Sequence, residues 1–321
     1  MVEKGRIKRM WKVDEVEWID IELTSFCNIS CGGCFRVVSK YADKLLNKEF
    51  LSLETIKKRF KKESFPNIKI INFCGSIDEP TTHKQFFEII DFFKKWNCHI
   101  NIATNGSTRT EKWWSRLGSS LKETSHNVTW GIDGSDKLSE VYRQGSNFNK
   151  VEKNYKAFND AGGSSIWQFI VFEHNEHQHE IAKKKASDEG FKSFKTIYSH
   201  RTVGPVKAVK HQIEETPYIE CKYLAQKRIF VNHSGNVIPC CHLNSETLEW
   251  TAGRENITRY GDVLNEAGGK LAINLEYNAL EDIIEGDVFE EIVDSWKDFS
   301  IPKCYQTCKK KKHDKFIKEE L

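Results

Sequence analysis

Three cysteines within eight residues near the N-terminus are the residues whose spacing points most directly to chemistry. Cys27, Cys31 and Cys34 follow an alternating segment, residues 17–23, that predicts a β-strand. Three thiolates on one tight loop can hold three irons of a [4Fe–4S] cluster and leave the fourth iron open to a substrate, whereas full cysteine ligation suits electron transfer. The same spacing also suits a zinc ion, so the loop alone leaves both metals open.

A second group of cysteines lies in the C-terminal third of the chain. It consists of Cys221, the adjacent Cys240 and Cys241, and the pair Cys304 and Cys308. Four thiolates from a loop, a hairpin and a C-terminal turn can enclose a complete [4Fe–4S] cluster or a structural zinc ion. The crowding of both groups argues against a disulfide framework, which is expected mainly in small secreted chains. We therefore expect a cytoplasmic location in which the thiols are kept for metal.

Length and composition narrow the class of protein. The chain has 321 residues, enough for one large domain and a smaller one. Its 49 basic and 46 acidic residues give a net charge of +3, which does not favour a dedicated nucleic-acid-binding protein. The sequence has no run of 18 apolar residues, so we expect no membrane-spanning helix.

Strand and helix patterns alternate between residues 17 and 197. Six strands are predicted, at Trp18–Leu23, Ile68–Phe73, His99–Ala103, Val128–Ile132, Ile166–Phe172 and Ser193–Ile197. Helical patterns lie between them, at Leu53–Phe60, Gln85–Trp96, Glu111–Leu117, Phe148–Ala161 and Glu176–Glu189. Such alternation predicts a parallel sheet, and six units are too few for a closed eight-stranded barrel. We expect an α/β fold, a partial (β/α)6 TIM-like barrel, with the cysteine loop at the carboxyl ends of the strands, where active sites of such sheets lie.

Polar motifs follow several of these predicted strands in succession. They are Glu79–Pro80 after the second strand, Thr104-Asn105-Gly106 after the third, and Gly131-Ile132-Asp133-Gly134 with the nearby Arg143 after the fourth. Each motif alone is ordinary turn chemistry, but chance does not readily give this order. Together with the cysteine loop, they resemble the radical S-adenosylmethionine (radical SAM) superfamily over residues 17–197. Two positions depart from the usual pattern: Gly33 stands where an aromatic residue is common, and Asp78 stands where glycine is usual.

The resemblance implies a cofactor site made from these motifs. Cys27, Cys31 and Cys34 would hold a [4Fe–4S] cluster whose open iron binds the amino and carboxylate groups of S-adenosylmethionine. The implied cofactor-binding residues are Glu79, Pro80, Thr104, Asn105, Asp133 and Arg143. Glu79 would contact the methionine amino group, and Asp133 would lie near the ribose or the substrate. Arg143 would pair with the methionine carboxylate, because a planar guanidinium matches a carboxylate at two points.

The second cysteine group resembles the auxiliary-cluster module called twitch, a shortened relative of the SPASM domain. We therefore expect a radical SAM core over residues 1–200 and a small α+β auxiliary-cluster domain over residues 201–321. The resemblance implies that Cys221, Cys240, Cys304 and Cys308 hold an auxiliary [4Fe–4S] cluster. The segments Arg228–Val231 and Asn236–Pro239 flank a turn and predict a hairpin.

The resemblance implies an enzyme that reductively cleaves S-adenosylmethionine and takes a hydrogen atom from a small-molecule or peptide substrate. An auxiliary cluster would assist a net oxidation by accepting an electron, and a donor such as flavodoxin or ferredoxin would supply the first electron. Arg201, Cys241 and His242 are our candidates for substrate contact or proton transfer. Only about sixteen residues precede the first predicted strand, which favours a small molecule or a peptide bound without a separate leader-binding domain. The alternative is a zinc-stabilised structural or nucleic-acid-binding module without catalysis.

Overall fold

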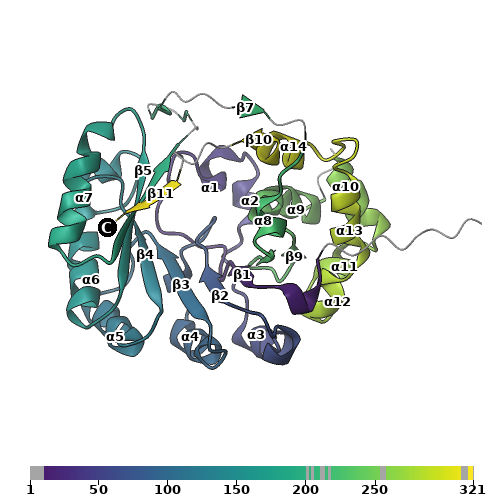
Figure 1. Ribbon diagram of the computed structural model, residues 1–321, viewed down its shortest axis with the longest axis horizontal. Helices are drawn as coiled ribbons and strands as arrows, with labels where there is room; N and C mark the ends of the chain where they lie inside the picture. The colour runs from purple at the N-terminus through teal and green to yellow at the C-terminus, as the bar shows by residue number, and fades with distance from the viewer. Residues whose placement is uncertain are drawn as a thin grey trace, which may run out of the picture.

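The computed structural model describes residues 11–199, 202–203, 206–209, 214–215, 218–253, 258–311 and 317–320. Six parallel strands form the centre of the fold: β1 (Trp18–Ile21), β2 (Ile70–Phe73), β3 (His99–Thr104), β4 (Asn127–Gly131), β5 (Ser165–Val171) and β6 (Ser193–Tyr198). The helices between them are α3 (Leu53–Arg59), α4 (Phe86–Lys94), α5 (Glu111–Leu121), α6 (Phe148–Asp160) and α7 (His179–Asp188). These helices cover the outer face of a curved, open sheet (Figure 1). The predicted partial barrel is confirmed, and element boundaries differ from the predicted ones by a few residues.

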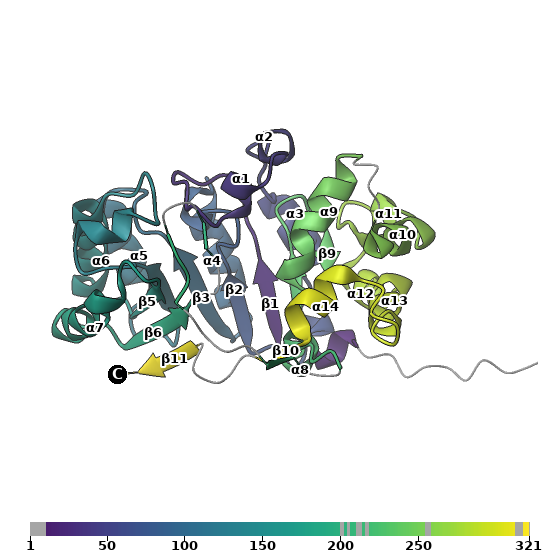
Figure 2. The same ribbon diagram turned by 90° about the horizontal axis from the view of Figure 1, so that it is seen from above.

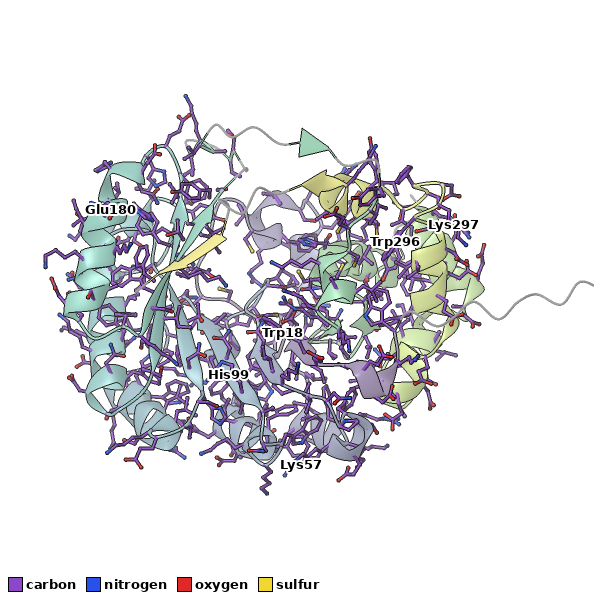
Figure 3. All side chains as sticks on the ribbon, viewed as in Figure 1. Trp18, Lys57, His99, Glu180, Trp296 and Lys297 are labelled. Atoms are coloured by element: carbon purple, nitrogen blue, oxygen red, sulfur yellow. The ribbon has the colours of Figure 1, made fainter. Side chains whose placement is uncertain are left out.

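The pleat of the strands separates an apolar outer face from a polar inner face. In β1, Ile19 and Ile21 are fully buried against the helix layer, whereas Asp20 lies between them on the other face. Asp20 is in register with Asn72 of β2, which is in register with Asn101 of β3. Trp18 and His99 lie two residues before Asp20 and Asn101 and share their face of the sheet. In Figure 3 both lie toward the middle of the molecule, whereas Lys57 and Glu180 lie at its periphery. The inside of the partial barrel is therefore lined by polar side chains.

The sheet extends beyond β1 into the C-terminal part of the chain. The predicted hairpin is present as β8 (Arg228–Val231) and β9 (Val237–Ile238), which pair antiparallel. β8 also pairs parallel with β1, so that Arg228 is in register with Trp18. At the opposite edge, β11 (Ile317–Glu320) pairs antiparallel with β6. A further short sheet joins β7 (Glu214–Glu215) to β10 (Lys310–Lys311).

Short helices make up most of the C-terminal region, which lies beside the β1 edge of the sheet (Figures 1 and 2). They are α8 (Lys222–Ala225), α9 (Asn244–Thr251), α10 (Arg259–Glu266), α11 (Lys270–Ile273), α12 (Leu280–Ile284), α13 (Asp287–Asp294) and α14 (Pro302–Cys308). Sequence periodicity predicts only one of them, a helix over Val288–Trp296 that corresponds to α13, because most of the others span no more than two turns. The region is thus more helical than the α+β pattern we expected. In the part of the chain that the structure describes, no helix combines the length and apolarity needed to cross a membrane.

Candidate active site

The cysteine loop lies at the carboxyl end of β1 and is fixed to two other motifs by backbone hydrogen bonds. The loop ends at Cys34, which precedes the first residue of α1 (Phe35–Val38). Ser30 N donates to Gln144 O at 2.8 Å and Gly32 N to Tyr142 O at 3.3 Å, on either side of Arg143. Glu79 N donates to Phe26 O at 2.8 Å. These bonds bring segments that are far apart in the sequence to the same end of the barrel.

One cavity of about 250 Å³ brings most of the predicted site residues together. Its lining includes Cys27, Cys31, Cys34, Glu79, Thr104, Asn105 and Arg143. Pro80 and Asp133 are buried but do not line it. Pro80 begins the 3-10 turn Pro80–Thr82, where its fixed φ suits a first helical position. Seven of the nine residues predicted for the first cluster and S-adenosylmethionine therefore surround one space.

Glu79 is held as a buried hydrogen-bond acceptor beside this cavity. Its Oε1 accepts hydrogen bonds from Thr81 Oγ1 at 2.5 Å and Thr104 Oγ1 at 2.7 Å, and its Oε2 accepts from Asn105 N at 2.8 Å. Burial raises the pKa of Glu79, and these hydrogen bonds oppose the rise. The carboxylate orientation is fixed before any ligand arrives.

Arg143 is positioned by Asp133 and by a glycine. Arg143 Nε lies 2.8 Å from Asp133 Oδ2, and Asp133 Oδ1 accepts from Ile170 N at 2.9 Å. Burial raises the pKa of Asp133, and the guanidinium opposes that rise. A Cβ added to Gly131 would lie 2.6–2.7 Å from three guanidinium atoms, so only glycine admits the side chain there. Asp133 thus stands behind Arg143 and holds it at the cavity wall.

The three thiols of the loop are chemically suited to bind metal. Burial, with Glu79 nearby, raises the pKa of Cys27 to about 12. Burial likewise raises the pKa of Cys31 to about 11, although Arg143 lowers it in part. Cluster ligation requires thiolates, so binding must displace these protons. Asn105 Nδ2 lies 3.6 Å from Cys27 Sγ, which supplies a donor beside the sulfur. Three clustered thiols with neighbouring donors fit a [4Fe–4S] cluster.

A larger polar chamber of about 750 Å³ inside the barrel adjoins the cavity beside the cysteine loop. Five residues line both spaces: Cys74, Ser76, Ala103, Thr129 and Gln168. A hydrogen-bonded ladder crosses the chamber wall, from Asn127 through Asn101 and Asn72 to Asp20, with donor–acceptor distances of 2.5–2.6 Å. Asp20 also accepts from Arg228 Nε at 2.6 Å and Tyr223 OH at 2.8 Å. The chamber wall is therefore an ordered set of polar groups.

A second polar network includes Ser76, which lines both the cavity and the chamber. Ser76 Oγ donates to Glu22 Oε2 at 2.6 Å, and Glu22 Oε1 lies 2.6 Å from His233 Nδ1. Glu22 and His233 are almost fully buried, and His233 Nε2 has no hydrogen-bond partner among the described residues. The donating hydroxyl leaves Ser76 Oγ lone pairs available to accept from a bound molecule. A buried carboxylate thus connects to a hydroxyl at the chamber wall.

The second cysteine group also lines one cavity. Cys221, Cys240, Cys304 and Cys308 lie around it together with Trp11, Trp296 and His242. Cys221 precedes α8 and accepts from Leu224 N at 3.5 Å. A hydrogen bond from Cys308 lowers the pKa of Cys221 to about 7, against the effect of burial, and raises that of Cys308. These four thiols have the donor chemistry that a cluster needs.

Cys240 and Cys241 face different spaces although they are adjacent. Cys240 lines the second cysteine cavity, whereas Cys241 lines the barrel chamber, where Tyr223 hydrogen-bonds to it. His242 borders the second cysteine cavity and a further surface pocket. Arg201 lies outside the described residues. Cys241 is therefore the predicted catalytic candidate that reaches the chamber.

Sequence reasoning missed several residues of this site. The largest omissions are Glu22, Ser76, His233, Asp20 and Arg228. One signal was available for the first strand: Asp20 and Glu22 alternate with apolar residues, which marks a polar inner face. For His233 and Arg228 the sequence offered none, because their contacts depend on the pairing of β8 with β1.

Comparison with known proteins was made on both sequence and structure. The family model described as the radical SAM superfamily matches residues 21–184, about half of the chain. A tungsten-containing aldehyde ferredoxin oxidoreductase cofactor-modifying protein of Pyrococcus furiosus is 32% identical over 98 residues, which cover 30% of this chain and 26% of that protein. A probable GTP 3′,8-cyclase of Pyrococcus horikoshii is 29% identical over 142 residues, covering 44% and 41%. The matches span less than half the length of these curated relatives.

Solved structures share the fold at low sequence identity. Streptococcus suis SuiB bound to its precursor peptide SuiA aligns with a TM-score of 0.58 and 13% identity, covering 92% of this chain and 71% of SuiB. anSMEcpe with bound AdoMet and the Cp18Cys peptide aligns with a TM-score of 0.56 and 15% identity, covering 93% and 84%. The family model, the cysteine loop and the partial barrel agree, and this chain belongs to the radical SAM superfamily.

Proposed function

We propose that this chain reductively cleaves S-adenosylmethionine at a [4Fe–4S] cluster and takes a hydrogen atom from a substrate held in the barrel chamber. When bound, the cluster and S-adenosylmethionine supply one electron and a 5′-deoxyadenosyl radical. The observation that carries the proposal is the cofactor cavity itself. Three cysteines, Glu79 and Arg143 line it, and it shares five side chains with the chamber. A reactive group formed in the cavity would therefore be adjacent to a molecule in the chamber.

The residues of the cavity would hold S-adenosylmethionine by its charged ends. Glu79 would accept from the methionine amino group, because its carboxylate is fixed at the cavity wall. Arg143 would bind the methionine carboxylate with the donors that do not face Asp133. Asp133 would act as a positioning residue for Arg143. This division of roles places both charged ends beside the cysteine loop and orients the reacting bond.

The chamber indicates a polar substrate, which we take to be a small molecule or a peptide. Its wall carries amide, hydroxyl and charged groups, including the ladder that ends at Asp20. SuiB and anSMEcpe have been solved with bound peptides, which supports the peptide class without establishing it. For a net oxidation, the Ser76–Glu22 network would accept the proton that the substrate loses.

We further propose that Cys221, Cys240, Cys304 and Cys308 hold an auxiliary [4Fe–4S] cluster. The four thiols line one cavity, so the chain itself can supply full cysteine ligation to a cluster there. A structural zinc ion bound by the same four cysteines is the alternative. As an electron acceptor, this cluster would support a net oxidation, and flavodoxin or ferredoxin would supply the electron at the first cluster.

The decisive experiment is 5′-deoxyadenosine formation by anaerobically reconstituted protein with S-adenosylmethionine and dithionite. We expect product with the wild-type chain and none with Cys31→Ala. Product from Cys31→Ala at the wild-type level would refute the assignment of the loop.

Iron analysis tests the two cysteine groups separately. The wild-type chain should hold about eight irons, which is two clusters of four. Cys31→Ala should lose about four of them, and Cys304→Ala should lose the other four. Cys98→Ala is the matched control, because Cys98 is a buried thiol outside both cavities. Zinc in place of iron at the second group would refute the auxiliary cluster and favour a structural metal.

A further inference from the structure

The cavity of the second cysteine group contains a buried indole N–H, that of Trp296, whose side-chain partner is the sulfur of Cys304. Trp296 follows α13, and its backbone N donates to Val293 O at 3.1 Å. Its side chain lines the cavity, and its buried Nε1 meets no nitrogen or oxygen acceptor within the described part of the chain. Figure 3 shows Trp296 within the C-terminal region and Lys297 farther out. A buried donor is costly without an acceptor, and the sulfur of Cys304 is the acceptor beside it.

Sulfur is the acceptor that this cavity offers. A hydrogen bond from Trp296 lowers the pKa of Cys304, which is one of the four cavity cysteines. Without a metal, Cys304 presents a thiol sulfur, which is a weak hydrogen-bond acceptor. A cluster would convert this thiol to a thiolate and bring further sulfide acceptors into the cavity. A metal-bound sulfur is therefore a better acceptor for the Trp296 N–H than a free thiol.

The other tryptophan of this cavity provides a contrast. Trp11 also lines it, but its Nε1 donates to Arg228 O at 3.2 Å. Trp11 is 4% exposed and packs edge-on against Phe289. It is therefore a packing residue whose N–H is already satisfied. The two indoles line the same space, and they differ in where the N–H is directed.

We propose that Trp296 donates its indole N–H to a sulfur of the auxiliary cluster and thereby raises the reduction potential of that cluster. This inference rests on the proposed auxiliary cluster. The reduced cluster carries one more negative charge than the oxidised cluster, so the positive end of the N–H dipole stabilises the reduced state more. Lys303 also borders the cavity, and its charge acts in the same direction in every variant. A higher potential makes the cluster a better electron acceptor for a substrate radical.

The test is an EPR-monitored redox titration of the full-length chain in a Cys31→Ala background, which leaves the auxiliary cluster as the paramagnetic centre. Trp296→Phe keeps an aromatic ring and removes the N–H. At the potential where the parent is half reduced, we expect the reduced-to-oxidised ratio to fall about tenfold, a shift of about 59 mV to lower potential for a one-electron couple. A second variant with the indole N–H replaced by sulfur, β-(3-benzothienyl)alanine at position 296, keeps the shape of the ring and should shift equally.

Trp11→Phe is the matched control and should leave the midpoint unchanged. Equal shifts in the Trp11 and Trp296 variants would overturn the inference, since they would indicate altered packing or solvent access. A midpoint unchanged by both replacements at position 296 would also overturn it. If the Cys31→Ala parent holds no iron, the auxiliary cluster itself is refuted and this inference falls with it. If the parent holds about four irons without any shift, only the role of Trp296 is wrong.

Discussion

Gly131→Ala tests whether the position of Arg143 controls binding of S-adenosylmethionine. The substitution adds one methyl group and changes no charge. The new Cβ would lie 2.6–2.7 Å from Arg143 Nη2, Cζ and Nη1. Ordinary contact begins near 3.4 Å, so the guanidinium must move by about 0.7 Å. Gly131 has no positive φ, so the effect is steric and not conformational.

The displacement is large compared with the contacts that fix Arg143. Its Nη2 donates to Asp133 Oδ1 at 3.3 Å, so a shift of that size away from Asp133 would break this hydrogen bond and lengthen the 2.8 Å ion pair between Nε and Oδ2. A side chain that keeps its pair with Asp133 must instead turn away from the cavity. Either way, about one charge-assisted hydrogen bond to the methionine carboxylate is lost, which is worth about 1.5–3 kcal/mol. The Kd for S-adenosylmethionine should rise roughly 10- to 150-fold.

Isothermal titration of anaerobically reconstituted protein with S-adenosylmethionine measures this change. Iron content should stay at the wild-type level, because the three cysteines that would hold the cluster are unchanged. Arg143→Ala separates the two steps of the reasoning. Wild-type affinity in Arg143→Ala would refute the role of Arg143 in binding. Weak binding by Arg143→Ala with wild-type affinity in Gly131→Ala would refute the steric argument alone.

Three further predictions concern other groups of the fold. Glu79→Gln should raise the Kd for S-adenosylmethionine at least tenfold, because the amide replaces one of the two acceptor oxygens with an NH2 donor. An unchanged Kd by titration calorimetry would contradict this. Asp20→Asn should lower the free energy of unfolding by about 3 kcal/mol, since Arg228 loses the carboxylate it pairs with at 2.6 Å; a loss under about 1 kcal/mol in urea titrations would contradict it. Burial, with His99 and Lys94 nearby, lowers the pKa of His126 to about 4, and its Nδ1 accepts from Ile100 N at 3.1 Å. The unfolded ring takes up its proton near pH 6.5 and the folded ring only near pH 4, so stability is full above about 6.5 and falls as the pH drops from there toward 4. Between pH 7 and pH 5, the urea midpoint of His126→Gln should fall less than that of the wild type, because the variant has no ring to take up a proton on unfolding. An unchanged pH dependence would contradict this.

Most of the barrel was predictable because its strands and helices are long enough to show their periods. The segments around Trp18, Ile70 and His99 carry the alternation that a half-buried strand requires. The C-terminal helices α9 to α12 were not predictable in the same way. They span few turns, and their packing depends on burial of residues such as Tyr260 and Leu264 rather than on a sustained pattern.

The cofactor residues were predictable where motif order carried information. Cys31, Glu79 and Arg143 line the same cavity, as their positions after successive strands implied. The roles of individual members depended on contacts. Asp133 was expected near the ribose or the substrate, and the structure adds that it is buried and pairs with Arg143. A spacing pattern shows that two residues share one end of a sheet, but it does not show which of them faces the cavity.

The sequence by itself determined the local chemistry of this protein. Thiol spacing within one loop is a covalent property of the chain, and strand and helix periods follow from which side chains must avoid water. Tertiary structure decided what the pairing of distant segments creates. The bond from Ser76 to Glu22, the pair of Glu22 with His233 and the convergence of four cysteines on one cavity join residues up to 211 positions apart. The pair of Glu22 with His233 arises when β8 aligns with β1, because that register places Val231 beside Ile21, just before the two paired residues.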